Sequence, residues 1–181
     1  MEFELLIFCH WLHDMENALT TYLHDHLGGS AFAIELLERI QAEYSNSEGG
    51  RIAREILPEI EEDRRILQEI VSKVGSFTFD IHDAIGWLAE RASRVKLKRA
   101  EPEGIGVFEA FETLGLGILG KRCLWEVLSL HAKTDVRLKG PYYPFLIERA
   151  QQQFLRVNQY RLKLAQTAFA EPKSGTARGK H

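Results

Sequence analysis

The chain has 181 residues, of which 45% are hydrophobic and 27% are charged. This balance is typical of a globular domain with a core, and it excludes an intrinsically disordered polyelectrolyte. The formal charge of −3 argues against a dedicated nucleic-acid-binding protein, because such domains are usually basic. The length fits one domain.

The two cysteines, Cys9 and Cys123, lie far apart in the sequence and form no Cys-x-x-Cys pair. They predict neither a disulfide framework nor a structural zinc site, which favours a cytoplasmic location. The apolar run near the N-terminus covers only residues 5–9. Because this run is too short for a signal peptide or a membrane span, we expect no transmembrane segment.

The two ends of the chain differ from the rest in composition. Residues 1–14 are apolar with an acidic start, and we interpret them as an N-terminal extension, with Met15 as an alternative start of translation. Residues 171–181 are small, polar and basic, which predicts a disordered tail. The folded domain is therefore expected to cover residues 15–170.

Four long segments show the three- and four-residue spacing of apolar side chains that is typical of amphipathic helices. They cover about residues 16–44, 51–74, 106–133 and 141–169. The apolar stripe of the second segment keeps its phase across Pro58, so we expect this proline on the solvent side of a kinked helix. No strand-like alternation competes, and the predicted fold class is all-α.

The third segment is apolar on two faces, one carrying Ile118 and Trp125 and the other Leu116, Cys123, Val127 and Leu130. A helix that is apolar most of the way round is expected to be buried. Its second face would be covered either by the N-terminal extension and a crossover helix or by a partner subunit. The stripe of the fourth segment contains Tyr142, Leu146, Ala150, Val157, Tyr160 and Leu164.

The connections between the segments predict the topology. Short turns follow the first and third segments, so each of these should pair with the next segment in an antiparallel manner. A crossover of about thirty residues separates the second segment from the third, and it contains a short amphipathic helix over residues 80–95. A long crossover lets its two flanking helices run parallel, which is typical of a ferritin-like four-helix bundle.

Polar side chains interrupt the apolar stripes near the middle of the predicted bundle. Each long segment contributes at least one of them, and a buried polar group needs a partner. We therefore predict a structural polar layer across the core, made of His26, Ser30, Asp63, Lys121, Arg122 and Gln153.

A metal site is the alternative interpretation of the same layer. His26, Glu59 and Asp63 are the side chains that could bind iron, manganese or zinc there. Ferritin-like di-metal bundles use two Glu-x-x-His motifs, and the sequence contains none. Lys121 or Arg122 would also place a positive charge where a metal should lie, so a paired ionic layer is the preferred interpretation.

Three further patterns favour structural interpretations. Cys9, His10 and His13 have metal-ligating types but no matching second group. Gly115, Gly117 and Gly120 precede Lys121 without the spacing of a phosphate-binding loop, and they predict close helix packing. The basic run of Arg91, Arg94, Lys96, Lys98 and Arg99 suits the C-terminal end of a helix better than an anionic surface. No nucleophile, histidine and acid can be grouped for catalysis.

The stretches at residues 22–30 (YLHDHLGGS), 61–64 (EEDR) and 120–125 (GKRCLW) resemble an uncharacterised bacterial family of small ferritin-like helical proteins. The resemblance covers about residues 16–168 and implies a four-helix bundle without an assigned activity. We expect a non-enzymatic module that acts through protein interaction, as a homodimer or with an unknown protein partner. The alternative is a protein that binds a metal or small ligand at the polar layer, with a stress or redox role.

Overall fold

The computed structural model describes residues 2–75 and 104–170, with side chains from residue 18 onward. These residues contain long helices and no strand, which confirms the all-α class for the described part of the chain. The predicted short helix at 80–95 and the predicted tail lie outside the described residues. The elements are α1 (Glu2–Glu43), α2 (Glu48–Val74), α4 (Ile105–His131), the 3-10 helix η1 (Val136–Leu138) and α5 (Tyr143–Ala168).

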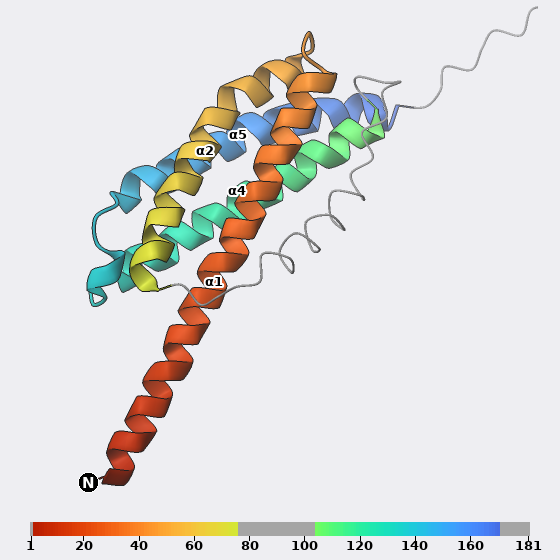
Figure 1. Ribbon diagram of the computed structural model, residues 1–181. Helices are drawn as coiled ribbons and strands as arrows, with labels where there is room; N and C mark the ends of the chain where they lie inside the picture. Colours follow the sequence, from red (N-terminus) through yellow and green to blue (C-terminus); the bar gives the residue numbers. More distant parts are fainter. Residues whose placement is uncertain (1, 76–103, 171–181) are drawn as a thin grey trace, which may run out of the picture.

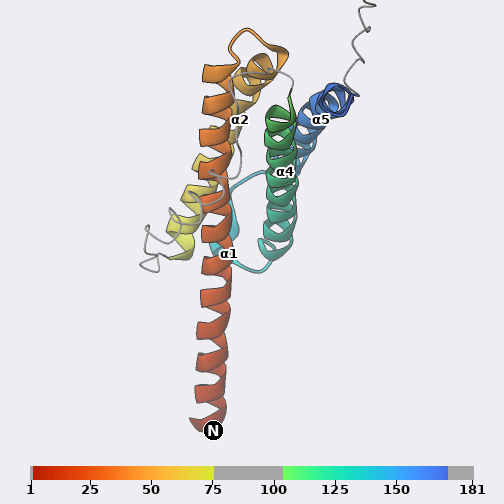
Figure 2. The ribbon, with the colours of Figure 1, turned by 90° about the vertical axis from the view of Figure 1, so that its right-hand side faces the viewer.

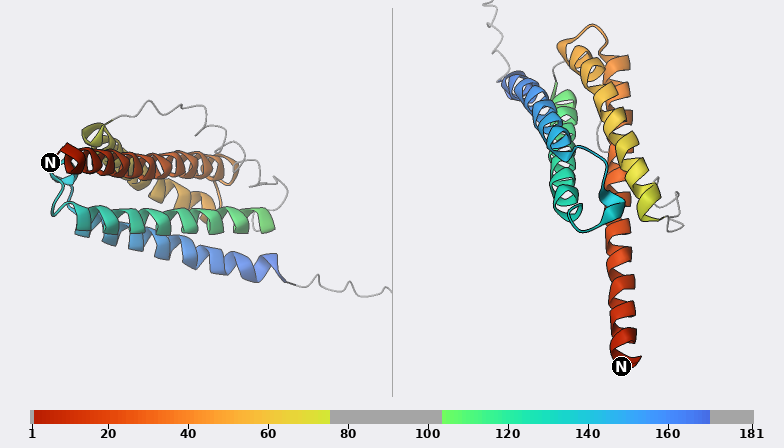
Figure 3. Two further views of the ribbon diagram at one scale, coloured as in Figure 1. Left: turned by 90° about the horizontal axis from the view of Figure 1, so that it is seen from below. Right: turned by 90° about the vertical axis from the view of Figure 1, so that its left-hand side faces the viewer.

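The helices form two layers of two, α1 with α2 and α4 with α5 (Figure 3). Helices within a layer are antiparallel, as the short turns predicted, and α2 and α4 run in the same general direction (Figure 1). The first fourteen residues were predicted as a separate extension. They are helical from Glu2 and continue into α1 without a break, so that α1 projects beyond the other helices (Figure 2).

The turn between α1 and α2 is fixed by a serine cap and a glycine. The Ser47 hydroxyl accepts a hydrogen bond from the Gly50 backbone N–H at 3.1 Å and donates one to the Tyr44 carbonyl at 2.8 Å. A Cβ atom on Gly50 would lie 2.0 Å from the Tyr44 carbonyl oxygen, so only glycine fits here. These contacts reverse the chain tightly and bring α2 against α1.

The core follows the predicted stripes closely in α2, where Ile52, Ile56, Ile60, Leu67, Ile70 and Val74 are all buried. Pro58 is exposed and α2 continues through it, as predicted. In α5 the stripe begins one residue later than predicted. Tyr142 is 73% exposed, while Tyr143 is buried and its hydroxyl donates to the Leu138 carbonyl. That hydrogen bond turns Tyr143 inward and leaves Tyr142 outside the core.

The second apolar face of α4 is exposed, and the crossover helix that was predicted to help cover it lies outside the described residues. Leu116 is 67% exposed and Leu130 is 61% exposed, and Cys123 and Val127 are exposed as well. The helix lies at the edge of its layer, packed against α5 on one side and α1 on another, and these contacts among the described residues cover only part of its circumference. Within the described residues, no helix is long and apolar enough to cross a membrane.

Candidate functional site

Asp63 lies near the middle of α2 and is 2% exposed. Its position between Ile60 and Leu67 on the apolar stripe turns the carboxylate toward α4 and α5. The Oδ1 atom pairs with the Arg149 guanidinium of α5, and Oδ2 pairs with the Lys121 ammonium of α4. A buried carboxylate with two cations joins the two helical layers.

Gln153 connects this carboxylate to a second one. Its amide is fully buried on α5, where Oε1 accepts a hydrogen bond from Lys121 and Nε2 donates to Glu59 at 3.0 Å and to Asp63 at 3.3 Å. Glu59 also pairs with Arg156 at 2.6 Å. We call these six residues the ionic cluster, which consists of Glu59, Asp63, Lys121, Arg149, Gln153 and Arg156.

Burial and pairing act in opposite directions on the pKa values in the ionic cluster. Desolvation lowers the pKa of Lys121, and the neighbouring Asp63 carboxylate partly offsets this effect. Desolvation raises the pKa of Glu59, but the hydrogen bonds from Arg156 and Gln153 and the nearby positive charges outweigh it, so that this pKa lies below its ordinary value. Two buried donors, Nε of the cluster member Arg149 and Nε1 of Trp125, have no hydrogen-bond partner in the described part of the chain.

The structure brings together three of the residues predicted for the polar layer, Asp63, Lys121 and Gln153. Arg122 does not join them, because it points away from the core and contacts Glu126 at 3.1 Å and Gln151 at 2.6 Å. Lys121 and Arg122 are consecutive, and successive side chains of a helix point about 100° apart, so both cannot enter one cluster. Arg149, which sequence reasoning placed at the edge of its stripe, takes the second cationic position.

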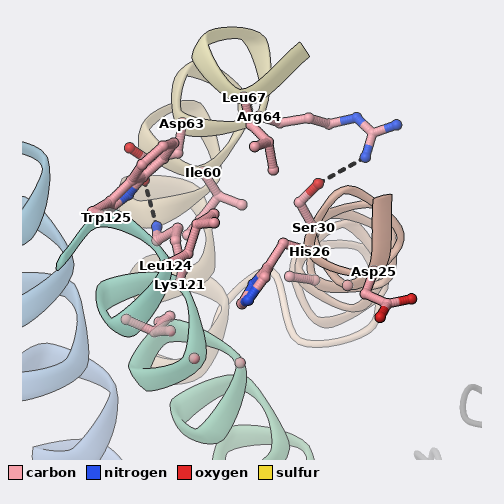
Figure 4. Close-up of a pocket in the computed structure, with 15 residues that line it drawn as sticks. Asp25, His26, Ser30, Ile60, Asp63, Arg64, Leu67, Lys121, Leu124 and Trp125 are labelled. Carbon is pink, nitrogen blue, oxygen red and sulfur yellow. Dashed lines mark hydrogen bonds and ion pairs between the residues drawn. The ribbon is translucent and has the colours of Figure 1, made fainter. Parts of the chain in front are cut away.

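The remaining two predicted residues, His26 and Ser30, lie on α1 across a cavity of about 360 Å³ between α1, α2 and α4 (Figure 4). Burial lowers the pKa of His26, with a smaller opposing effect from Asp25. We call this space the mid-bundle cavity. Its lining residues are Asp25, His26, Gly29, Ser30, Ala33, Ile60, Asp63, Arg64, Leu67, Gly117, Ile118, Gly120, Lys121, Leu124 and Trp125.

Arg64 joins α2 to α1 at the rim of the mid-bundle cavity. Its Nη1 atom donates to the Leu27 carbonyl at 2.6 Å and to the Ser30 hydroxyl at 2.7 Å. Desolvation lowers the pKa of this guanidinium, and no carboxylate in the described part of the chain pairs with it. Sequence reasoning did not select Arg64, because it lies off the apolar stripe. Its one signal was its place in the EEDR stretch.

The three candidate metal ligands do not form a site. Glu59 and Asp63 bind cationic side chains of α4 and α5, whereas His26 projects from α1 into the cavity. No group of three acidic, histidine or cysteine residues in the described ranges could hold a metal ion. The side chains of Cys9, His10 and His13 and the whole basic run at 91–99 lie outside the described residues.

The glycines of α4 have two different surroundings. A Cβ atom on Gly115 would touch Val157 at 3.6 Å, which agrees with the predicted close helix packing. At Gly117 and Gly120 a Cβ atom would meet nothing within 4 Å, and both residues line the mid-bundle cavity. Close packing therefore does not explain these two glycines, which instead leave open space.

We compared the chain with known proteins. It matches no protein-family model, no curated protein and no solved structure. The ferritin-like resemblance is therefore still a prediction, and the ionic cluster and the mid-bundle cavity are the features that bear on function.

Proposed function

We propose that the protein is a non-enzymatic helical bundle that binds a small, largely apolar molecule in the mid-bundle cavity. The observation that carries this proposal is the cavity itself, whose volume of about 360 Å³ lies between helices of both layers. Ligand pockets in proteins have volumes of roughly 300–1,000 Å³, apolar walls and a few polar groups. Ile60, Leu67 and Leu124 supply such walls, and Ser30 and Lys121 supply polar groups.

The glycines around the cavity support a binding role over a packing defect. Gly29 on α1 and Gly117 and Gly120 on α4 all line the cavity, and a Cβ atom at any of the three would meet nothing within 4 Å. Each glycine inside a helix costs roughly 0.5–1 kcal/mol relative to alanine. An alanine or a larger residue would stabilise the helices and fill the space. A ligand that occupies the cavity would explain why these positions carry glycine.

The test uses N-phenyl-1-naphthylamine, an uncharged dye whose fluorescence rises in apolar surroundings. Gly29→Leu places a side chain in the cavity, and the matched control Gly28→Leu adds the same side chain to the same helix outside the cavity lining. We expect the wild type and Gly28→Leu to bind the dye equally and Gly29→Leu to bind it at least about tenfold more weakly, as the loss of roughly 1.4 kcal/mol implies.

Circular dichroism establishes that both glycine variants are folded before the dye is added. If the wild type does not bind the dye, or if Gly29→Leu binds it as well as Gly28→Leu does, the mid-bundle cavity is not a binding site for apolar molecules.

A second function, self-association, rests on the exposed apolar face of α4. Leu116, Cys123 and Leu130 follow one another at seven-residue intervals, and Val127 lies between the last two. This spacing suits a helix that packs against a second helix of the same kind. We propose that a second copy of the chain packs along this α4 stripe, defined by Leu116, Cys123, Val127 and Leu130, to form a homodimer.

Light scattering after size exclusion tests the homodimer. Leu116→Lys should convert a dimer into a monomer, whereas the control Leu162→Lys, at a leucine of α5 that is also exposed (51% against 67% for Leu116), should leave it dimeric. A monomeric wild type, or a Leu116→Lys protein that stays dimeric, would rule out an interface on the α4 stripe.

We propose a ferritin-like arrangement in which residues 76–103 form the crossover between α2 and α4, and a cytoplasmic protein that does not bind nucleic acid. The parallel course of α2 and α4 supports the crossover. The ionic cluster argues against iron, manganese or zinc as the ligand, because its carboxylates already bind cationic side chains.

A further inference from the structure

The Arg64 guanidinium has unused hydrogen-bonding capacity at the cavity rim. Both of its interactions come from Nη1, which binds Leu27 and Ser30. An arginine has five N–H donors, and the Nε and Nη2 donors lie together along one edge of the guanidinium. That edge has no partner in the described part of the chain. It is the edge that binds a carboxylate through two parallel hydrogen bonds.

The arginine is also held in place, which distinguishes it from a flexible surface side chain. Figure 4 shows Arg64 reaching from α2 to Ser30 on α1. The Ser30 hydroxyl itself donates to the Leu27 carbonyl at 2.7 Å, so its oxygen is oriented to accept from Arg64. A guanidinium anchored in this way loses less conformational freedom when it binds a ligand.

The charges around the cavity leave an excess of positive charge. In the ionic cluster three cations, Lys121, Arg149 and Arg156, pair with two carboxylates, Glu59 and Asp63. Arg64 adds a further cation, and none of the described carboxylates pairs with it. The other acidic residue of the lining, Asp25, turns away from the cavity in Figure 4. An anionic ligand would therefore complement the walls, and a cationic one would not.

We infer that the ligand of the mid-bundle cavity is an amphipathic organic acid, with its apolar part among Ile60, Leu67 and Leu124 and its acid group on the free edge of Arg64. This inference rests on the proposed binding function and names the class of molecule that the cavity takes. The acid group binds the Nε and Nη2 donors while Nη1 stays on Leu27 and Ser30.

The test compares two dyes that share one aromatic body. 8-Anilinonaphthalene-1-sulfonate carries an acid group, and N-phenyl-1-naphthylamine lacks it. Each is titrated into the wild type, Arg64→Gln and Arg64→Lys. We expect Arg64→Gln to weaken sulfonate binding by about tenfold or more, as the loss of a charge-assisted hydrogen bond implies, and to leave the uncharged dye unaffected. Arg64→Lys keeps the positive charge but not the paired donors. Its affinity for the sulfonate dye should therefore lie between those of the wild type and Arg64→Gln.

Two further measurements locate and classify the bound anion. Gly29→Leu should weaken binding of the sulfonate dye as well, whereas Gly28→Leu should not. Decanoate should displace this dye from the wild type at lower concentration than decanol does, because the two chains are equally long and only decanoate carries an acid group. Sulfonate binding that survives in Gly29→Leu would place the anion outside the cavity and overturn the inference.

The outcomes separate the two proposals. If the uncharged dye binds in the cavity but sulfonate binding is the same in the wild type and Arg64→Gln, the binding function stands and the inference about an acid is wrong. If both dyes weaken equally in both Arg64 variants, Arg64 shapes the cavity and does not recognise an anion, which also overturns the inference. If neither dye binds the wild type, the binding function itself fails.

Discussion

Asp63 and Arg64 are consecutive residues of α2 whose side chains point about 100° apart and have very different surroundings. Asp63 faces α4 and α5, where both carboxylate oxygens are paired. Arg64 faces α1, where its Nη1 atom donates hydrogen bonds to the Leu27 carbonyl and the Ser30 hydroxyl. Its Nε and Nη2 donors have no partner in the described ranges. A polar group with every hydrogen-bonding position filled stabilises the fold. A polar group that is anchored but incompletely paired can bind a ligand.

The largest effect is expected when the Asp63 carboxylate is removed. Asp63→Ala leaves Lys121 and Arg149 as buried cations without their shared partner, and it should lower the free energy of unfolding by roughly 3–5 kcal/mol. Urea denaturation followed by circular dichroism measures this loss. Glu62→Ala is the neighbouring control, because the Glu62 pair with Arg65 is exposed and its loss should change stability by less than about 1 kcal/mol. A loss below about 1 kcal/mol in Asp63→Ala would show that the ionic cluster does not stabilise the fold.

Removing one cation should have a smaller effect than removing the carboxylate. In Lys121→Met the Asp63 side chain keeps Arg149 and Gln153, so no charge is left without a partner. The Gln153 oxygen loses its donor, and we expect a loss of about 1–3 kcal/mol in the same denaturation experiment. A loss as large as that of Asp63→Ala would mean that Lys121 alone compensates the carboxylate, and that Arg149 contributes little.

Removing Arg64 should affect stability less than removing Asp63 or Lys121. Arg64→Gln takes away two hydrogen bonds at a partly exposed position, and the expected loss is about 0.5–1.5 kcal/mol. The same urea titration provides the value, with Asp63→Ala measured beside it. If Arg64→Gln destabilises the protein as strongly as Asp63→Ala does, both residues are structural and the contrast between the two faces of α2 disappears.

The sequence pattern was sufficient to find Asp63 because a single carboxylate interrupts an otherwise apolar stripe between Ile60 and Leu67. The choice between Lys121 and Arg122 was not available from the pattern, since both flank the line through Ile118 and Trp125. Contacts with α2 and α5 decide which of the two turns inward. The helices themselves were predictable within a few residues, apart from the start of α1, because local periodicity determines them.

Arg64 and the mid-bundle cavity were not predictable for a different reason. The anchor of Arg64 is Ser30, which is 34 residues away in the sequence and on another helix. A cavity is a property of how far apart three helices lie, and no local pattern encodes that distance. Gly117 and Gly120 do line the cavity, but a glycine in a helix is compatible both with close packing and with open space.

The smallest expected effect concerns His26, which lines the cavity on the same side as Arg64. Its pKa in the folded protein is lowered by burial, while in the unfolded chain it should be near 6.5. Below that pH the unfolded chain binds a proton that the folded protein resists, so stability should fall as the pH decreases through 6.5. His26→Gln removes this contribution and leaves the other ionisable groups unchanged.

Lowering the pH from 7.5 to 5.5 should therefore decrease the urea midpoint of the wild type more than that of His26→Gln. The charged neighbours of His26 around the cavity are Asp25, Arg64 and Lys121, and only the first favours protonation. A midpoint difference that stays constant with pH would mean that His26 titrates alike in both states. A difference that favours the wild type at low pH would mean that Asp25 outweighs burial, and that the α1 side of the cavity is governed by charge pairing as the Asp63 side is.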